Sequence, residues 1–207
     1  MAPTPTTTAS AAPAGPTTGR WNDVAEAALT LFSERGYHGT TMKHVAAELG
    51  VQAPSLYNHV GSKQEILARI MKTGMERMIA RQDEALASTD DPVEQLRLMT
   101  EAHVLVHTSH RRSALIGDRE LRNLEEPART EQRGRRELYE RRFRDTIERG
   151  SLNGSFRVNS PKLASFAIIE MATSVAVWFR DDGPLTEADV AKEYGEMALR
   201  IVGVAAA

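Results

Sequence analysis

Cysteine is absent from the chain, which excludes disulfide bonds, thiol nucleophiles and zinc sites with cysteine ligands. A chain of 207 residues without cysteine is typical of a reducing compartment, so we expect a cytoplasmic protein. The sequence also lacks the GxSxG, HExxH, P-loop and GxGxxG patterns of common catalytic and nucleotide-binding sites. We therefore expect no catalytic residues and no cofactor.

Long hydrophobic runs and an excess of one charge are missing as well. The longest apolar stretch, residues 163–179, has only 17 residues and contains Glu170, so we expect no membrane span. The 26 basic and 28 acidic side chains give a formal net charge of -2. A nucleic-acid function must therefore be argued from local residues, because the overall charge does not indicate one.

The first 19 residues contain no charged side chain and no large apolar one except Met1. Such a segment buries too little surface to offset the entropy lost on ordering. We therefore expect residues 1–19 to be a disordered tail. The segment also lacks the basic start and the continuous apolar stretch of a secretory signal.

From Arg20 onward the apolar residues recur at helical spacing, and short alternating strand-like runs are not found. We expect an all-α fold of about nine helices, with a three-helix helix-turn-helix domain over residues 20–68 and a larger helical bundle over residues 69–207. The expected helices run from Asn22 to Gly36, Thr41 to Gly50, Ala53 to His59, Ser62 to Ser88 and Asp91 to Ser109, over Arg111–Arg149 with an interruption near Pro127, from Ser160 to before Asp181, and from Thr186 to Val202.

Residues 42–60 have the spacing of a helix-turn-helix. Ala46 provides a small residue where two steeply crossing helices touch, and Gly50 provides a turn residue able to adopt positive φ. The second helix is polar on its outer side, and in such a motif it enters the major groove of DNA. The alternative is a helical hairpin without a role in DNA binding.

Within and around this segment, a series of short motifs resembles the DNA-binding domain of the TetR family of bacterial transcriptional regulators. The resemblance covers residues 21 to about 70 and rests on Gly36–Tyr37, Gly39–Thr41, Val45–Ala46, Leu49–Val51, Pro54–Val60 and Ser62–Lys63. It implies that Tyr57, His59 and Lys63 contact the phosphate backbone of double-stranded operator DNA. Thr41 would present its hydroxyl to a phosphate, and bases would be read by Lys43, Gln52, Ala53, Ser55 and Asn58. Without the resemblance, the spacing favours a phosphate contact for His59 no more than an ordinary surface or core histidine.

Three histidines, His103, His107 and His110, lie on or beside the apolar face of one expected helix. A metal site is one reading, but no carboxylate accompanies them on that face, so we expect no metal. The others are core histidines with satisfied hydrogen bonds and polar anchors in an apolar ligand pocket. The TetR resemblance implies an effector pocket in the C-terminal bundle, which favours the last reading.

The segment from Arg111 to Arg149 holds 12 arginines and 9 acidic residues. A solvated helix with many ion pairs is one interpretation, and arginines that bind ligand phosphates are the other. The string from Asp118 to Leu124, with Arg136, Tyr139 and Glu140, resembles TetR-family regulators of lipid and steroid breakdown that sense acyl-CoA thioesters. This resemblance implies an acyl-CoA or other lipophilic effector. The expected ligand-binding residues are His103, His107, His110, Arg119, Arg122, Arg136 and Glu170, the last because a carboxylate in an apolar run must be paired or line a pocket.

The last two long helices have apolar faces that require cover. We expect them to form the four-helix interface of a homodimer, although they could also belong to the core of one chain. The candidate interface residues are Phe166, Thr173, Val177, Tyr194, Ala198 and Ile201. The predicted function is a ligand-responsive DNA-binding repressor that a small amphiphilic effector releases from its operator. The alternative is an all-helical interaction module with a degenerate helix-turn-helix.

Overall fold

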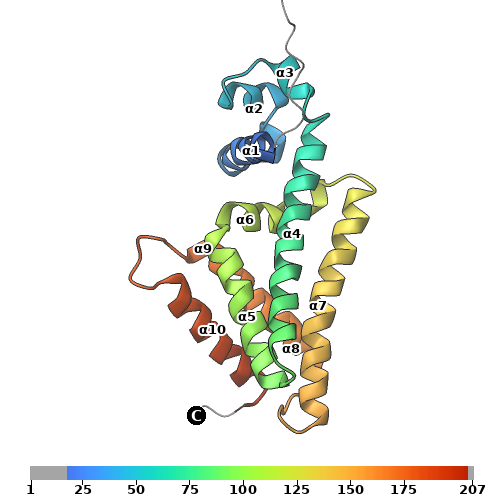
Figure 1. Ribbon diagram of the computed structural model, residues 1–207, viewed down its shortest axis with the longest axis vertical. Helices are drawn as coiled ribbons and strands as arrows, with labels where there is room; N and C mark the ends of the chain where they lie inside the picture. The colour runs from blue at the N-terminus through green and yellow to red at the C-terminus, as the bar shows by residue number, and fades with distance from the viewer. Residues whose placement is uncertain (1–17, 205–207) are drawn as a thin grey trace, which may run out of the picture.

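The computed structural model describes residues 18–204, and this part of the chain contains α-helices, one short 3-10 helix and no strand (Figure 1). The all-α prediction is confirmed. The elements are α1 (Thr18–Gly39), α2 (Met42–Glu48), α3 (Ala53–Tyr57), α4 (Lys63–Ser88), α5 (Pro92–Ser109), α6 (Arg111–Arg119), η1 (Leu121–Asn123), α7 (Ala128–Leu152), α8 (Pro161–Thr173), α9 (Val175–Trp178) and α10 (Glu187–Ile201).

Several expected boundaries differ from the observed ones. α1 continues past a kink at Gly36 to Gly39, and α3 ends at Tyr57 and not at His59. The tail predicted over residues 1–19 lies mostly outside the described residues, and α1 already includes its last two positions. The helix expected from Ser160 is divided near Ser174 into α8 and α9, which accounts for one more helix than the nine expected segments. Finally, α7 continues beyond Arg149 to Leu152.

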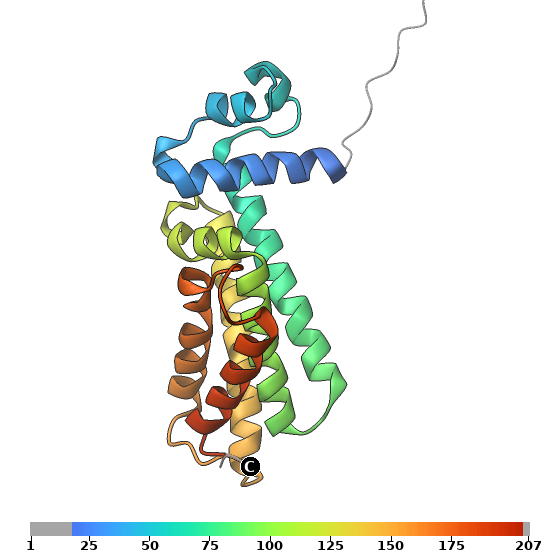
Figure 2. The same cartoon turned by 90° about the vertical axis from the view of Figure 1, so that its left-hand side faces the viewer.

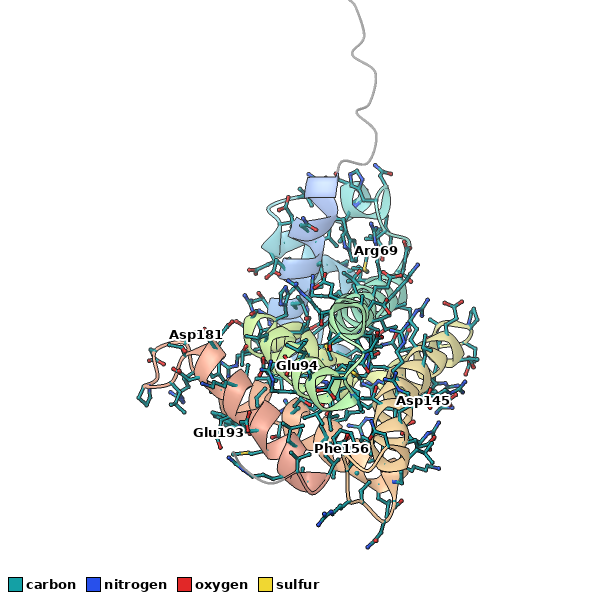
Figure 3. All side chains as sticks on the ribbon, turned by 60° about the horizontal axis from the view of Figure 1, so that its bottom comes forward. Arg69, Glu94, Asp145, Phe156, Asp181 and Glu193 are labelled. Atoms are coloured by element: carbon teal, nitrogen blue, oxygen red, sulfur yellow. The ribbon has the colours of Figure 1, made fainter. Side chains whose placement is uncertain are left out.

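The loop expected at Gly150 is not observed there, because α7 continues through this residue. A Cβ atom at this position would lie 2.1 Å from the ring of Phe156, so the glycine is needed for a close approach inside the helix. The chain leaves the helix afterwards, through Gly154 at φ +82°. Phe156 is thereby buried at the end of the bundle, while Asp145, Asp181 and Glu193 point outward (Figure 3).

The N-terminal helices form a compact unit at one end of the molecule (Figure 1). Thr41 caps α2 by accepting a hydrogen bond from the His44 backbone amide at 3.2 Å. Between α2 and α3, Gly50 adopts φ +67°, the left-handed conformation expected for the turn. Ala46 and Leu56 are buried beneath the turn, so the predicted helix-turn-helix packing is confirmed.

Below this unit, α4, α5, α7, α8 and α10 run along the long axis, and α6 crosses beneath α1 (Figure 2). The core of α1–α3 also takes in Ile116 of α6 and Leu124 after η1. A separate core around Phe143, Ile147 and Ile168 fills the bundle. Two segments of the C-terminal half therefore complete the core of the N-terminal unit. No helix among residues 18–204 is long and apolar enough to cross a membrane.

Candidate functional site

The outer surface of α2 and α3 carries most of the residues predicted to contact DNA. Tyr57 is 52% exposed, and Lys43, Gln52 and Asn58 are exposed as well. Leu56 and Val60 point the other way into the core, which fixes the face that α3 presents to solvent. The predicted base-reading and phosphate-binding residues of this short helix are therefore available for contact. Ser55 and His59 are half-buried, and Ala53 packs partly against the core.

Thr41 retains a donor for a partner outside the chain. Its hydroxyl oxygen accepts the hydrogen bond from the His44 amide, and His44 Nδ1 accepts one from the Thr41 amide at 3.3 Å. A threonine hydroxyl both accepts and donates, so the Thr41 hydrogen remains free. This side chain is exposed at the start of α2.

Lys63 has an internal role that sequence reasoning missed. Its ammonium donates hydrogen bonds to the carbonyls of Tyr37 and Thr40, both at 2.6 Å, and lies 4.2 Å from the centroid of the Tyr37 ring. Partial burial lowers the pKa of Lys63. Because an ammonium has three hydrogens, one remains for a phosphate after these two bonds. Lys63 therefore joins the start of α4 to the end of α1, in addition to any contact with DNA.

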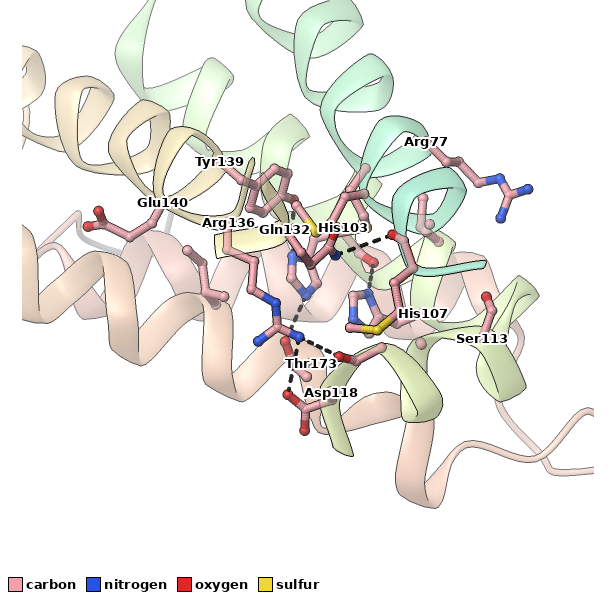
Figure 4. A pocket seen from close by; sticks show the side chains of 18 of the residues that line it. Arg77, His103, His107, Ser113, Asp118, Gln132, Arg136, Tyr139, Glu140 and Thr173 are labelled. Carbon is pink, nitrogen blue, oxygen red and sulfur yellow. Dashed lines mark hydrogen bonds and ion pairs between the residues drawn. The ribbon is translucent and has the colours of Figure 1, made fainter. Parts of the chain in front are cut away.

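A cavity of about 350 Å³ lies within the C-terminal bundle (Figure 4). We call it the bundle cavity. Its walls come from α4, α5, α6, α7 and α8. The lining residues are Met71, Gly74, Met75, Arg77, Met78, His103, Val106, His107, His110, Ser113, Ala114, Gly117, Asp118, Gln132, Arg136, Glu137, Tyr139, Glu140, Phe166, Ile169, Glu170 and Thr173. Its size is at the lower end of the range for small-molecule sites.

The imidazole of His103 is a buried polar group in the wall of the cavity. Its Nδ1 is 3.0 Å from the Tyr139 hydroxyl, and its Nε2 is 3.1 Å from the Thr173 hydroxyl. Burial lowers the pKa of His103 well below its ordinary value and raises that of Tyr139. Both groups are therefore neutral near pH 7. We call these three side chains the His103 relay.

His107 stacks on His103, with ring centroids 4.2 Å apart and planes inclined by 4°. Its Nδ1 donates a hydrogen bond of 2.9 Å to the His103 carbonyl, one turn earlier in α5. Burial lowers the pKa of His107, and the hydrogen bond to His103 opposes this effect. His110, the third predicted histidine, lines the cavity but is exposed at the end of α5.

The arginines at the cavity are only partly those expected from sequence. Arg136 donates a 2.7 Å hydrogen bond to the Gly117 carbonyl and lies 3.9 Å from the Asp118 carboxylate, which links α7 to α6 (Figure 4). Arg77 lines the cavity from α4 and points away from its centre. Arg119 and Arg122 were also expected to bind the ligand. Both are exposed and outside the lining of this cavity, because they face solvent at the end of α6 and in η1.

Glu170 lines the cavity, as expected of a carboxylate in an apolar run, although its side chain is exposed. Gln132 and Thr173 also line the cavity, although neither was expected to bind a ligand. A signal for Gln132 exists, since it belongs with Tyr139 and Phe143 to the buried stripe of α7. Residues 18–204 contain no group of three or more histidine or acidic side chains that could hold a metal.

The candidate interface residues fall into four groups. Phe166 and Thr173 line the bundle cavity. Ala198 is 0% exposed in the core of its own chain and cannot contact a partner, so it is removed from the interface. Tyr194 packs partly against a small core formed with α9, whereas Val177 and Ile201 are exposed. The exposed apolar residues of α8 and α9, which we call the α8–α9 face, are Leu163, Phe166, Val177 and Trp178.

Polar contacts join the bundle to the helix-turn-helix unit through α6 and η1. Arg112 of α6 donates to the Thr30 hydroxyl at 2.9 Å and lies 3.4 Å from Glu26, both in α1. The Asn123 side-chain oxygen is 3.0 Å from His38 Nε2, and the Asn123 backbone carbonyl accepts a hydrogen bond of 2.6 Å from the Gln64 side chain. Because α6 also lines the cavity, the two candidate sites share one structural element.

Both parts of the chain match known protein families. Residues 24–70 match the tetR family of bacterial regulatory proteins, and residues 89–202 match the tetracyclin repressor-like C-terminal domain. Together these matches include α2, α3 and the cavity-lining helices α5, α6, α7 and α8, but not the cavity-lining part of α4.

Individual relatives are similar over most of the chain. The HTH-type transcriptional repressor KstR2 of Mycobacterium tuberculosis is 27% identical over 183 residues, which are 87% of this chain and 92% of the relative. A tetR-family regulatory protein from Rhodococcus RHA1 has a TM-score of 0.85 at 28% identity, covering 92% of this chain and 100% of its own. AibR, solved in complex with isovaleryl coenzyme A and operator DNA, has a TM-score of 0.78 at 27% identity, covering 86% of this chain and 97% of its own. The chain therefore belongs to the TetR family of DNA-binding transcriptional regulators.

Proposed function

We propose that the protein is a repressor that leaves its operator when an acyl-CoA thioester binds in the bundle cavity. The observation that carries this proposal is the composition and position of the cavity. Methionines of α4 provide an adaptable apolar wall, arginines lie at the edge, and α6 joins the cavity to α1. The repressor KstR2 and the isovaleryl coenzyme A complex of AibR support the same assignment by similarity.

The acyl group would occupy the cavity, and the nucleotide of coenzyme A would lie at its edge. A volume of about 350 Å³ is too small to enclose a whole acyl-CoA, since even drug-sized ligands require sites of roughly 300 to 1,000 Å³. Arg77 forms no ion pair within the part of the chain that the structure describes. We assign Arg77 the first contact with the phosphates and Arg136 a second.

Release of DNA would follow from a change in the position of α6. A phosphate that draws Arg136 away from Gly117 removes a contact that holds α6 against α7. The movement would reach α1 through Arg112 and the helix-turn-helix core through Ile116. The effect is bounded by the difference in effector affinity between the two arrangements, and coupling of about 1 to 3 kcal/mol is typical.

We infer that Tyr57, His59, Lys63 and Thr41 contact phosphates, and that the base-reading residues are Lys43, Gln52, Ala53, Ser55 and Asn58. The exposed polar face of α2 and α3 supports this assignment. Two half-sites are needed, because the N-terminal unit has little excess positive charge, and the α8–α9 face would bring two copies together. We also infer that the protein is a regulator without enzymatic activity. It would act in the cytoplasm, where its DNA target lies.

The test is fluorescence anisotropy with labelled DNA from the region upstream of the protein's own gene. Octanoyl-CoA, octanoate and free CoA are added separately, and only the thioester is expected to weaken DNA binding, by roughly 5- to 150-fold. Binding of octanoyl-CoA without loss of DNA affinity would contradict the proposed switch. Absence of sequence-specific binding to any genomic fragment would favour the interaction module instead.

A further inference from the structure

At one end of the bundle cavity, the His103 relay has an unused hydrogen-bond donor and His107 has an unused acceptor. Tyr139, His103 and Thr173 together have three hydrogens available: two hydroxyl hydrogens and one on the ring. They form two hydrogen bonds with each other. If Nδ1 of His103 carries the ring hydrogen, the Tyr139 hydroxyl has a free hydrogen, and if Nε2 carries it, the Thr173 hydroxyl does. In either tautomer the relay keeps one donor.

His107 provides the complementary acceptor. Its Nδ1 donates to a backbone carbonyl, so that nitrogen carries the hydrogen and Nε2 carries a lone pair. The side chain is only 9% exposed, yet Nε2 forms no hydrogen bond within the described residues. No fully buried side-chain nitrogen or oxygen in residues 18–204 lacks a partner, so this nitrogen retains open space beside it. His107 lines the bundle cavity, which supplies that space.

The His107 ring lies parallel to the His103 ring with the centroids 4.2 Å apart, so the acceptor of His107 and the hydroxyls bonded to His103 line the same part of the cavity. A saturated acyl chain here would leave both unpaired, which is costly inside a protein. A hydroxyl group satisfies both, since its oxygen accepts one hydrogen bond while its hydrogen makes another. A carbonyl satisfies the donor alone.

We propose that this end of the bundle cavity recognises a hydroxyl group on the acyl part of the effector, with His107 Nε2 accepting its hydrogen and the His103 relay donating to its oxygen. The inference rests on the proposed acyl-CoA effector and narrows it to hydroxyacyl thioesters. The remaining cavity wall, formed by the methionines of α4 with Val106 and Ile169, contacts the alkyl carbons.

Calorimetric titration with matched thioesters tests the proposal. The probes are octanoyl-CoA, oxo-octanoyl-CoA and a series of hydroxy-octanoyl-CoA esters that differ in hydroxyl position. The best hydroxylated ester is expected to bind about 10-fold tighter or more than octanoyl-CoA, with the oxo ester between them. Equal affinities across the series overturn the hydroxyl proposal and leave the acyl-CoA proposal standing. Failure of every CoA ester to bind rejects the acyl-CoA proposal itself.

In each variant, the measured quantity is the ratio of the affinity for the best hydroxylated ester to the affinity for octanoyl-CoA. This ratio does not change when a variant weakens the binding of both esters equally. His107→Phe keeps an aromatic ring against His103 and is expected to abolish most of the preference for the hydroxylated ester. His107→Gln keeps an acceptor and should retain much of it. Leu105→Met, on α5 outside the cavity, is the control with an unchanged ratio. An unchanged ratio in His107→Phe overturns the role of His107 as the acceptor. Unchanged ratios in both Thr173→Val and Tyr139→Phe overturn the role of the His103 relay as the donor.

Discussion

At the α2–α3 end of the molecule the polar side chains point into solvent, whereas in the bundle cavity they point at one another. Tyr57 and Asn58 are exposed, while His103 has both ring nitrogens hydrogen-bonded inside the protein. The difference follows from the ligands. DNA is a large charged surface that contacts side chains from outside, whereas a small effector must be enclosed by groups already held in place.

The two regions are also less separate than their positions in the chain indicate. Ile116 and Leu124 belong to the C-terminal half by sequence but are buried in the core of the N-terminal unit. Gly117 and Asp118 of the same segment line the bundle cavity. Packed side chains and hydrogen bonds of this kind can carry coupling between two distant sites.

The largest effect is expected at Ala198, which was a candidate interface residue but is buried in the bundle core. Ala198→Arg places an unpaired charge in the bundle core and should lower the free energy of unfolding by about 4 kcal/mol or more. Urea denaturation measures this loss. Ile201→Arg, three residues later on the exposed side of α10, is the control and should cost less than about 1 kcal/mol. Similar losses in both variants would contradict the burial difference.

The α8–α9 face gives the next effect. Val177 is 62% exposed, so Val177→Arg should leave the single chain folded. In a homodimer the new charge would be buried at the interface, and the dimer dissociation constant should rise about 100-fold or more. Sedimentation equilibrium measures the constant, and operator binding should fall with it. A dimer that persists in Val177→Arg would place the interface on another surface.

Lys63 distinguishes a structural role from a DNA contact at the N-terminal unit. Lys63→Ala removes two charge-assisted hydrogen bonds, to the carbonyls of Tyr37 and Thr40, and should lower the free energy of unfolding by about 1 to 3 kcal/mol, besides weakening DNA binding. Lys43→Ala, on the exposed side of α2, should weaken DNA binding with a stability change below about 0.5 kcal/mol. Equal stability of the two variants would show that the Lys63 hydrogen bonds contribute little.

The buried histidines predict a dependence of stability on pH. Burial lowers the pKa values of His103 and His107 below their ordinary value of 6.5. As the pH falls below about 6.5, the unfolded chain therefore binds protons that the folded chain does not, and the free energy of unfolding decreases. The slope is at most about 1.4 kcal/mol per pH unit for each histidine. Urea denaturation across this range should show a smaller slope for His107→Gln, and identical slopes would contradict this prediction.

The smallest effect tests the connection between the two regions. Arg112 is exposed, so Arg112→Ala should change the free energy of unfolding by less than about 1 kcal/mol. The loss of DNA affinity caused by octanoyl-CoA should nevertheless shrink by about 2- to 3-fold, because the link from α6 to α1 is removed. Arg81→Ala removes an ion pair within α4 and is the matched control. An effector response equal to wild type in Arg112→Ala would exclude this route.

Much of the local structure could be predicted from short-range patterns. Ser62 and Asp91 cap α4 and α5 as expected, since a capping side chain bonds to amides only two or three residues away. The helix-turn-helix was recognisable because Ala46 and Gly50 are constrained by their immediate neighbours. The exposed polar side of α3 was likewise identifiable from its spacing, whereas the DNA contacts expected there come from the TetR resemblance.

The tertiary structure alone decided which of several equivalent faces is inside. Arg136 and Arg122 lie in the same arginine-rich segment, yet only Arg136 reaches the cavity. Ala198 and Ile201 lie on the same predicted stripe, yet one is in the core and the other is exposed. Helical periodicity defines a stripe but not the neighbour that covers it, because that neighbour comes from a distant part of the chain. Hence the sequence determined the all-α fold and the DNA-binding helix, whereas long-range packing brought His103, Tyr139 and Thr173 together.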